Sequence, residues 1–324
     1  MVDHVLTKSG AALEIERSGE VALRTINLTK QYGQRLAVNN LNLEVRRGEI
    51  FGFLGPNGAG KTTTIRMALG LIAPTAGNVE IFGRDVFVER ARILPRVGAL
   101  IETPALYLYL SGRNNLRAIG SALGGVPEKR IDQVLDQVGL AGRQKDKVRT
   151  YSLGMKQRLG VAMALLQDPE LLILDEPANG LDPAGIVEMR DLMHNLVRSG
   201  KTIFISSHLL TEVQQICTRV AIINQGRLVT ESSVTELTRG QGDFRISVEN
   251  ASAALALVQA QPWGAEARLE HDGTLVTRGP DGSGRALNLF LSQAGFVPET
   301  LERSVQDLEQ VFLQLTDTGS GDIK

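Results

Sequence analysis

The residue run GPNGAGKTT at positions 55–63 has the composition of a phosphate-binding loop. It matches the pattern G-x-x-x-x-G-K-[ST], and it lies between an apolar run from Ile50 to Leu54 and a stretch with helical periodicity. Glycines let the backbone curl so that successive amides point at phosphate oxygens, and the positive end of the following helix adds its partial charge. The predicted phosphate-binding residues are Gly55, Pro56, Asn57, Gly58, Ala59, Gly60, Lys61, Thr62 and Thr63.

Three side chains at the end of this loop suit the phosphates and a metal ion. Lys61 is expected to reach the β- and γ-phosphates as a point charge, and the Thr62 hydroxyl to ligate Mg²⁺. Thr63 adds a hydroxyl for phosphate oxygens. A glycine-rich turn with a purely structural role is the alternative interpretation. The expected ligand is a nucleoside triphosphate with Mg²⁺.

A pair of carboxylates follows a second apolar run. In LLILDEP, four apolar residues predict a buried strand that delivers Asp175 and Glu176 to the phosphate end of a parallel sheet. Asp175 is expected to hold the Mg²⁺ shell. Glu176 is expected to orient and deprotonate the attacking water, a role that contributes roughly 10²–10⁴ in rate. An ordinary charge pair at a strand end is the alternative.

Two later segments complete a recognisable set of motifs. YSLGMKQR occupies positions 151–158, and the apolar run TIFISSH ends at His208. The phosphate loop, the serine-glycine segment, the aspartate-glutamate strand end and this histidine resemble, in that order, the ATPases of ATP-binding cassette (ABC) transporters across about residues 21–235. The resemblance implies ATP binding and hydrolysis. It also implies a head-to-tail dimer with a second copy or a similar ATPase.

The resemblance assigns five further residues to the nucleotide. Ser152 and Gly154 match the signature segment that faces the γ-phosphate of the opposite subunit, and His208 matches the histidine that contacts the γ-phosphate and helps to place Glu176. Tyr32 resembles the aromatic residue that stacks on adenine, and Asp182 the loop residue that communicates across the dimer. Each has a structural alternative, such as a helix N-cap for Ser152.

The chain departs from the family pattern at a few positions. Leu153 and Met155 replace the usual glycine and glutamine of the signature, and Glu102 stands where glutamine is usual. The glutamate variant resembles the subgroup that exports bacitracin and lantibiotic peptides, and the closing SVQDLEQVFLQLT resembles drug-export ATPases. Carboxylate oxygen remains a suitable Mg²⁺ ligand, so Glu102 joins Thr62 and Asp175 as a predicted metal ligand.

The order of apolar patterns predicts an α/β fold with a second domain. Alternating residues from Val21 to Val45 predict antiparallel strands, the region from about Ala91 to Gly142 reads as mainly helical, and turn-rich strands after Ser232 predict an α+β appendage. The expected fold is a P-loop NTPase core of the ABC ATPase type with an antiparallel β subdomain and a helical subdomain. The expected divisions are a flexible tail at 1–20, the ATP-binding domain at 21–238 with its helical subdomain at about 91–165, an accessory α+β domain at 239–316 and a second tail at 317–324.

Bulk properties limit the partners. No run approaches the roughly 18 apolar residues of a membrane helix, so a separate membrane permease is expected to hold the chain at the cytoplasmic face of the membrane. The formal charge of −1 and the absence of long like-charged blocks argue against nucleic acid. The mixed aromatic and apolar residues Tyr107, Leu108 and Tyr109 are the expected permease contact.

Three rival functions can be compared with the sequence, and one of them stays open. A nucleic-acid ATPase of the same lineage predicts two cassettes or long coiled coils, and neither is present. A GTP-binding switch predicts an N-K-x-D segment after the phosphate loop, which is also missing. An ABC-type ATPase with a regulatory or immunity role and no net transport would use the same residues, so the sequence leaves it open.

Overall fold

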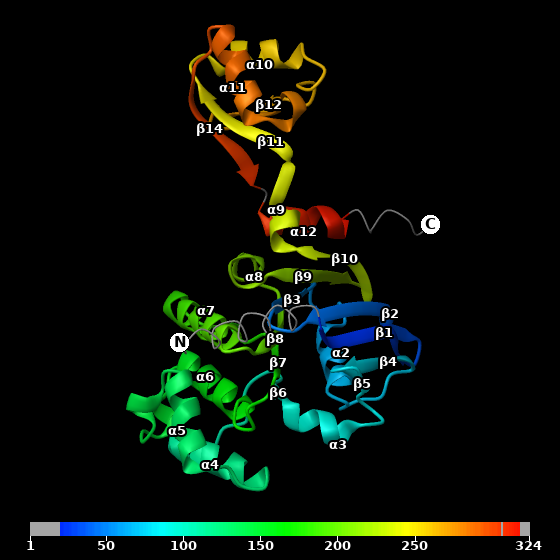
Figure 1. The fold of residues 1–324 in the computed structure, drawn as a ribbon, viewed down its shortest axis with the longest axis vertical. Helices are drawn as coiled ribbons and strands as arrows, with labels where there is room; N and C mark the ends of the chain where they lie inside the picture. The colour runs from blue at the N-terminus through cyan, green and yellow to red at the C-terminus, as the bar shows by residue number, and fades with distance from the viewer. Residues whose placement is uncertain (1–19, 306, 318–324) are drawn as a thin grey trace, which may run out of the picture. The chain divides into compact units, whose positions relative to one another are not determined.

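The computed structural model describes residues 20–305 and 307–317 of the 324-residue chain. The predicted tails at 1–20 and 317–324 lie almost entirely outside the described residues. The chain divides into two compact units, Met1–Ser233 and Val234–Lys324 (Figure 1). The second unit therefore begins a few residues before position 239, because the helix α9 (Val234–Thr238) belongs to it.

A six-stranded sheet forms the centre of the first unit. Its strand order is β10-β9-β3-β8-β7-β6, and only β10 runs antiparallel to its neighbour. Every residue of β3, β7 and β8 is buried, which explains why these strands read as continuous apolar runs. The bounds are β3 Ile50–Leu54, β6 Val97–Leu100, β7 Leu171–Asp175, β8 Thr202–Ser207, β9 Arg219–Asn224 and β10 Arg227–Ser233.

A second, antiparallel sheet packs against the first. Its order is β2-β1-β4-β5, formed by Arg35–Arg46, Val21–Tyr32, Ala76–Ile81 and Arg84–Asp85. Along β2 buried and exposed residues alternate from Leu41, so one face points into the core shared with the parallel sheet. The aromatic rings of Phe51 and Phe204 stack in that core with centroids 5.9 Å apart. The antiparallel strands predicted from Val21 to Val45 are thus present.

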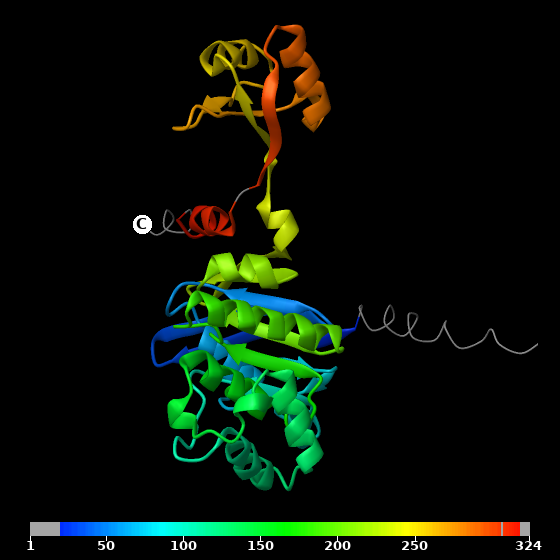
Figure 2. The ribbon, with the colours of Figure 1, turned by 90° about the vertical axis from the view of Figure 1, so that its left-hand side faces the viewer.

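Helices surround the parallel sheet, and three of them gather beside one end of it (Figures 1 and 2). These three are α4 Gly112–Ala122, α5 Glu128–Gln137 and α6 Leu153–Ala164, each in contact with the other two. The other α-helices among the described residues of the first unit are α2 Lys61–Ala68, α3 Arg90–Ile93, α7 Pro183–Arg198 and α8 Leu210–Ile216. Short 3₁₀ turns occupy Leu94–Arg96, Ala141–Arg143 and Val148–Thr150.

The prediction of a mainly helical region from residue 91 to 142 was wrong for one segment. Val97–Leu100 forms β6, an edge strand parallel to β7 in the central sheet. Four residues are too few to display a strand period, and the segment is held by long-range contact instead. A side chain at Gly98 would lie 2.3 Å from the carbonyl oxygen of Ala164, so glycine is required for the close approach of α6.

The second unit is a small α+β fold. Its antiparallel sheet has the order β12-β13-β11-β14, and with α10 and α11 the chain runs β-α-β-β-α-β, the split βαβ arrangement. Phe244, Ile246 and Leu275 from the sheet pack on Leu287 and Leu291 of α11. The bounds are β11 Arg239–Val248, α10 Ala251–Gln259, β12 Arg268–Leu269, β13 Leu275–Arg278, a 3₁₀ turn at Pro280–Gly282, α11 Gly284–Gln293, β14 Pro298–Val305 and α12 Leu308–Asp317.

Candidate nucleotide site

The loop between β3 and α2 has the shape expected of a phosphate cradle. Gly58 and Gly60 have φ angles of 82° and 107°, a region that side chains disfavour. A Cβ on Gly60 would lie 2.5 Å from the carbonyl oxygen of Ala37, and one on Gly55 would lie 2.5 Å from that of Ile223. These glycines are therefore required both for the curl of the loop and for its packing against the sheets.

Lys61 is the first residue of α2 and lies at the bottom of the loop. Its side chain is only 7% exposed, and its ammonium group donates to the carbonyl oxygen of Gly55 at 2.6 Å. The same nitrogen lies 3.5 Å from Glu176 Oε1. The loop thus holds the cation in place, close to the carboxylate at the end of β7.

The side chains of Thr62 on α2, Asp175 on β7 and Ser206 on β8 meet beside Lys61. The hydroxyl of Thr62 lies 3.1 Å from Asp175 Oδ2, and the hydroxyl of Ser206, on β8, donates to the other oxygen of Asp175. Asp175 is 2% exposed. Hydroxyl and carboxylate oxygens are the ligands that Mg²⁺ prefers, so the Thr62 hydroxyl and the Asp175 carboxylate fit the metal predicted for this position. In the described part of the chain, no cluster of three or more His, Cys, Asp or Glu side chains offers an alternative metal site.

Glu176 stands in an unusual backbone conformation directly after β7. Its φ is 50°, a strained value for glutamate, and its amide donates to the Ser206 hydroxyl at 3.1 Å. Its Oε2 accepts from the backbone amide of His208 at 3.3 Å and lies 2.7 Å from the imidazole Nδ1. His208, directly after β8, therefore contacts one oxygen of this carboxylate through both its amide and its imidazole, and its predicted contact with the γ-phosphate stays a prediction.

A cavity of about 450 Å³ opens over these groups. It has the size of a small-molecule site. Tyr32 lies on its wall, half exposed, with the Lys30 ammonium 5.1 Å from the centre of its ring. The sequence analysis missed two lining residues, Arg35 and Ala37. The lining residues are Tyr32, Arg35, Ala37, Pro56, Asn57, Gly58, Gly60, Lys61, Thr62, Thr63 and Glu176.

The predicted signature and dimer-loop residues lie outside this cavity and beside each other. Ser152 caps α6 by accepting from the amide of Met155 at 3.2 Å, and Asp182 caps α7 by accepting from that of Gly185 at 3.0 Å. A Cβ on Gly154 would lie 3.8 Å from the Cα of Gly185, so the two helix starts meet. The N-cap alternative for Ser152 is thus realised, and an additional role in nucleotide binding stays a prediction.

Glu102 is not among the residues that line the cavity. Its carboxylate pairs with Arg66 of α2 at 2.9 Å, and both side chains are largely exposed. Its φ is 58°, again left-handed. The structure therefore places Glu102 with a cation rather than with Thr62 and Asp175, and its predicted contact with Mg²⁺ would require this ion pair to open.

The helical subdomain carries an exposed aromatic surface, defined here as the 107–110 patch. Tyr107 and Tyr109 are 59% and 79% exposed. Leu108 and Leu110, which alternate with them, are also exposed. A depression of about 690 Å³ adjoins the patch, and its lining includes Lys145 and Lys147.

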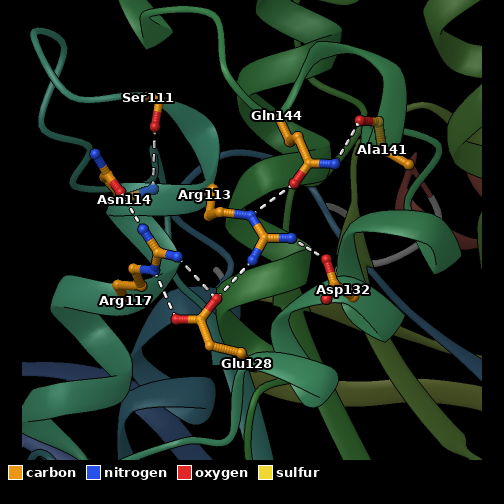
Figure 3. A network of polar contacts seen from close by, with 8 residues as sticks. All are labelled: Ser111, Arg113, Asn114, Arg117, Glu128, Asp132, Ala141 and Gln144. Carbon is orange, nitrogen blue, oxygen red and sulfur yellow. Dashed lines mark hydrogen bonds and ion pairs between the residues drawn. The ribbon is translucent and has the colours of Figure 1, made fainter.

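Ion pairs and a hydrogen bond connect residues in the wall of this depression to their neighbours. Arg113 contacts Glu128 at 2.6 Å, together with Asp132 and Gln144, and Arg117 contacts Glu128 at 2.6 Å (Figure 3). Neighbouring arginines hold the pKa of the Glu128 carboxyl below its usual value, chiefly through the hydrogen bond from Arg117. The network ties the start of α4 to α5 and to the turn at residue 144.

Among the described residues, no helix combines the length and the apolar character needed to cross a membrane.

Comparison with known proteins places these features in a family. The family profile described as ABC transporter matches residues 38–179. The bacitracin transport ATP-binding protein BcrA of Bacillus licheniformis is 43% identical over 302 residues, which is 92% of this chain and 98% of that protein. The lantibiotic transport ATP-binding protein SrtF of Streptococcus pyogenes is 42% identical over 209 residues, which is 64% of this chain and 90% of that protein.

Solved structures agree with the sequence comparison. A structure described as the ATP-binding subunit of an ABC transporter superposes with a TM-score of 0.60 at 30% identity, covering 67% of this chain and 92% of its own. The cbiO1 protein of Clostridium perfringens, described as part of the ABC transporter complex cbiONQ, gives a TM-score of 0.63 at 25% identity over 75% of this chain and 96% of its own. The predicted α/β fold of the ABC ATPase type is confirmed.

Proposed function

The chain belongs to the ATP-binding proteins of ABC transporters, and from this premise we propose that it powers export of a peptide antibiotic or a similar drug through a separate membrane permease. Membership of the family makes it an ATP-hydrolysing transporter subunit. The proposed class of cargo rests on the names of the relatives that transport bacitracin and lantibiotics. The observation that carries the proposal is the single cavity in which Tyr32, Lys61 and Glu176 meet.

We propose that ATP lies in this cavity with its base on Tyr32 and its phosphates on the glycine loop. The amides of the loop and the Lys61 ammonium would bind the β- and γ-phosphates. Thr62 and Asp175 would hold Mg²⁺, which when bound neutralises the charge that develops on the phosphates. Their oxygens already lie 3.1 Å apart, a spacing that suits ligands of one ion.

The proposed hydrolytic step uses Glu176 as the base. Its carboxylate would orient the attacking water and accept the proton, while the contact of His208 at 2.7 Å would hold the carboxylate in place. The buried hydroxyl of Ser206 accepts a hydrogen bond from the Glu176 amide and donates one to Asp175, and these two bonds hold the strained turn at Glu176. Precise placement of the base is worth more here than acid-base strength alone, because the phosphoryl group needs in-line attack.

The proposed dimer supplies the groups that one chain leaves outside its cavity. Ser152 is exposed at the start of the 12-residue helix α6, where a hydroxyl, free amides and the helix dipole favour an anion. We propose that this segment of one copy closes over the γ-phosphate held by the other. Asp182, beside it at the start of α7, would contact the partner copy at the same closure.

The proposed permease contact is the 107–110 patch. Exposed aromatic residues on a folded surface suit burial against a partner helix. Lys145 and Lys147 rim the adjoining depression, and within the described residues neither has a carboxylate partner. The occupant is therefore expected to be a cytoplasmic permease segment with apolar and acidic side chains. Through it the chain would be bound peripherally at the cytoplasmic face of the membrane.

Crosslinking tests this contact with little background. Cys217 is the only cysteine of the chain, is buried, and has a thiol pKa that burial raises far above the usual value. Tyr109→Cys thus creates one reactive site. In native membranes this variant should crosslink to the permease, whereas Leu289→Cys, at a position of the second unit that is also well exposed, should not. Equal crosslinking from both positions would contradict the proposed contact.

A further inference from the structure

A second cation lines the nucleotide cavity besides Lys61. Arg35 follows Tyr32 by three residues, is exposed, and was not among the predicted site residues. Lys61 is already engaged by the carbonyl oxygen of Gly55 and by Glu176. Arg35, by contrast, forms no ion pair or hydrogen bond through its side chain with any residue in the described ranges. Its charge is therefore available to a ligand.

The β1–β2 hairpin aims Arg35 at the cavity. Tyr32 and Arg35 are cross-strand partners at its tip, so both side chains project from the same face. The strand beyond them is fixed, because the amide of Asn39 donates to the carbonyl oxygen of Gly226 at 2.8 Å and the carbonyl of Ala37 abuts Gly60. The tip of the hairpin thus has a defined position over the phosphate loop.

The guanidinium lies close to the loop itself. A terminal nitrogen of Arg35 is 3.6 Å from the point that a Cβ on Gly58 would occupy. Gly58 is in the middle of the predicted phosphate cradle, and its left-handed φ of 82° turns the backbone at that point. The charged side chains lining the cavity are Arg35, Lys61 and Glu176. Without Arg35 their formal charges cancel, and the polyphosphate of ATP would enter a neutral site.

We propose that Arg35 binds the phosphate chain of the nucleotide and so favours nucleoside di- and triphosphates over nucleosides. This inference rests on the proposed placement of ATP, with the base on Tyr32 and the phosphates on the loop. Arg35 lines the same cavity as Tyr32 and the loop, and its guanidinium lies near Gly58 of that loop. Arginine suits this role because its planar fork donates two parallel hydrogen bonds to phosphate oxygens, which lysine cannot do.

Nucleotide affinity measures the contribution of Arg35 directly. Dissociation constants are determined in EDTA, which prevents hydrolysis, by displacing trinitrophenyl-labelled ATP from the purified chain with ATP, ADP or adenosine. Arg35→Ala is expected to weaken ATP and ADP about tenfold, the loss typical of one charge-assisted hydrogen bond, and to leave adenosine unchanged. Arg35→Lys should recover only part of the loss. The effect on ATP should shrink as salt rises.

Two further variants serve as controls for this measurement. Arg46→Ala removes another exposed arginine, at the far end of β2, and should bind all three ligands like the native chain. Lys61→Ala should lose ATP binding outright. Native affinity for ATP in Arg35→Ala, with binding lost in Lys61→Ala, would overturn the inference and leave the proposed function standing. Equal losses for adenosine and ATP would also overturn it, since that points to a disturbed hairpin. If the native chain itself fails to bind ATP, the proposed function and this inference are both wrong.

Discussion

The ion cluster at Glu170 predicts a specific loss of stability in acid. Glu170 directly precedes β7, and its carboxylate contacts Arg47 at 2.6 Å and Arg96 at 2.5 Å. Both guanidinium groups also lie over the ring of Phe82, 4.5 and 4.1 Å from its centre. The hydrogen bond from Arg96 is the main reason that the pKa of Glu170 falls from 4.5 to about 2. Arg47 and Phe82 come from the antiparallel sheet region, so the cluster ties that region to the strand that carries Asp175.

The magnitude follows from this pKa. A fall from 4.5 to about 2 corresponds to an upper limit of about 3 kcal/mol of stability above pH 4.5. The Glu170 side chain is 41% exposed, and screening by solvent reduces the expected contribution to about 1 kcal/mol. Because the folded-state pKa is the lower one, this stability is complete above the unfolded value. It disappears as the pH falls from about 4.5 to about 2.

Urea unfolding of the native chain and of Glu170→Gln tests the reasoning, with far-UV circular dichroism as the signal. At pH 7 the variant should unfold with a free energy about 1 kcal/mol lower, and the difference should fall by roughly half or more by pH 3. Glu44→Gln, which alters an exposed pair with Arg24, should change stability by less than about 0.5 kcal/mol at either pH. A difference that is the same at pH 7 and pH 3 would refute an ionic origin.

Three further predictions concern the site. Gly60→Ala places a Cβ at a φ of 107° and 2.5 Å from the Ala37 carbonyl oxygen, so ATP binding should be lost with about 1–3 kcal/mol of stability, and native affinity by calorimetry would contradict the loop geometry. Ser152→Ala and Ser111→Ala each remove an N-cap with a 3.2 Å bond and should cost about 1 kcal/mol by thermal melting, but only Ser152→Ala should also abolish ATPase activity. Arg66→Ala frees the Glu102 carboxylate and should lower the Mg²⁺ concentration for half-maximal ATPase activity; an unchanged requirement would exclude Glu102 as a metal ligand.

The sequence predicted the parts of the site that are local. The phosphate loop, the strand end at Asp175 and the strand end at His208 each lie within a short run whose composition determines the backbone path. Because β7 and β8 are buried on both faces, their sequences are nearly continuous apolar runs, and such runs predict buried strands. Their alignment side by side then follows from the rule that carboxyl ends of parallel strands share one edge of the sheet.

What the sequence could not supply are partners far apart along the chain. The short strand β6 exists because Gly98 fits under Ala164, a contact that no periodicity records. Arg66 belongs to a helix that was correctly predicted, yet its pairing with Glu102 depends on tertiary approach. Arg35 had a local signal, a cation three residues after Tyr32, but its relevance depends on a hairpin that folds over the loop.

ATP turnover by Glu176→Gln tests the central claim most directly. The native chain should hydrolyse ATP in the presence of Mg²⁺, and the variant should bind ATP, lose turnover by about 10²-fold or more and accumulate as a dimer by size-exclusion chromatography. Glu44→Gln provides the matched control, since it makes the same chemical change on the outer surface of the antiparallel sheet. Undiminished hydrolysis by Glu176→Gln would contradict the assignment of the catalytic base. Hydrolysis lost without an ATP-dependent dimer would contradict the shared site.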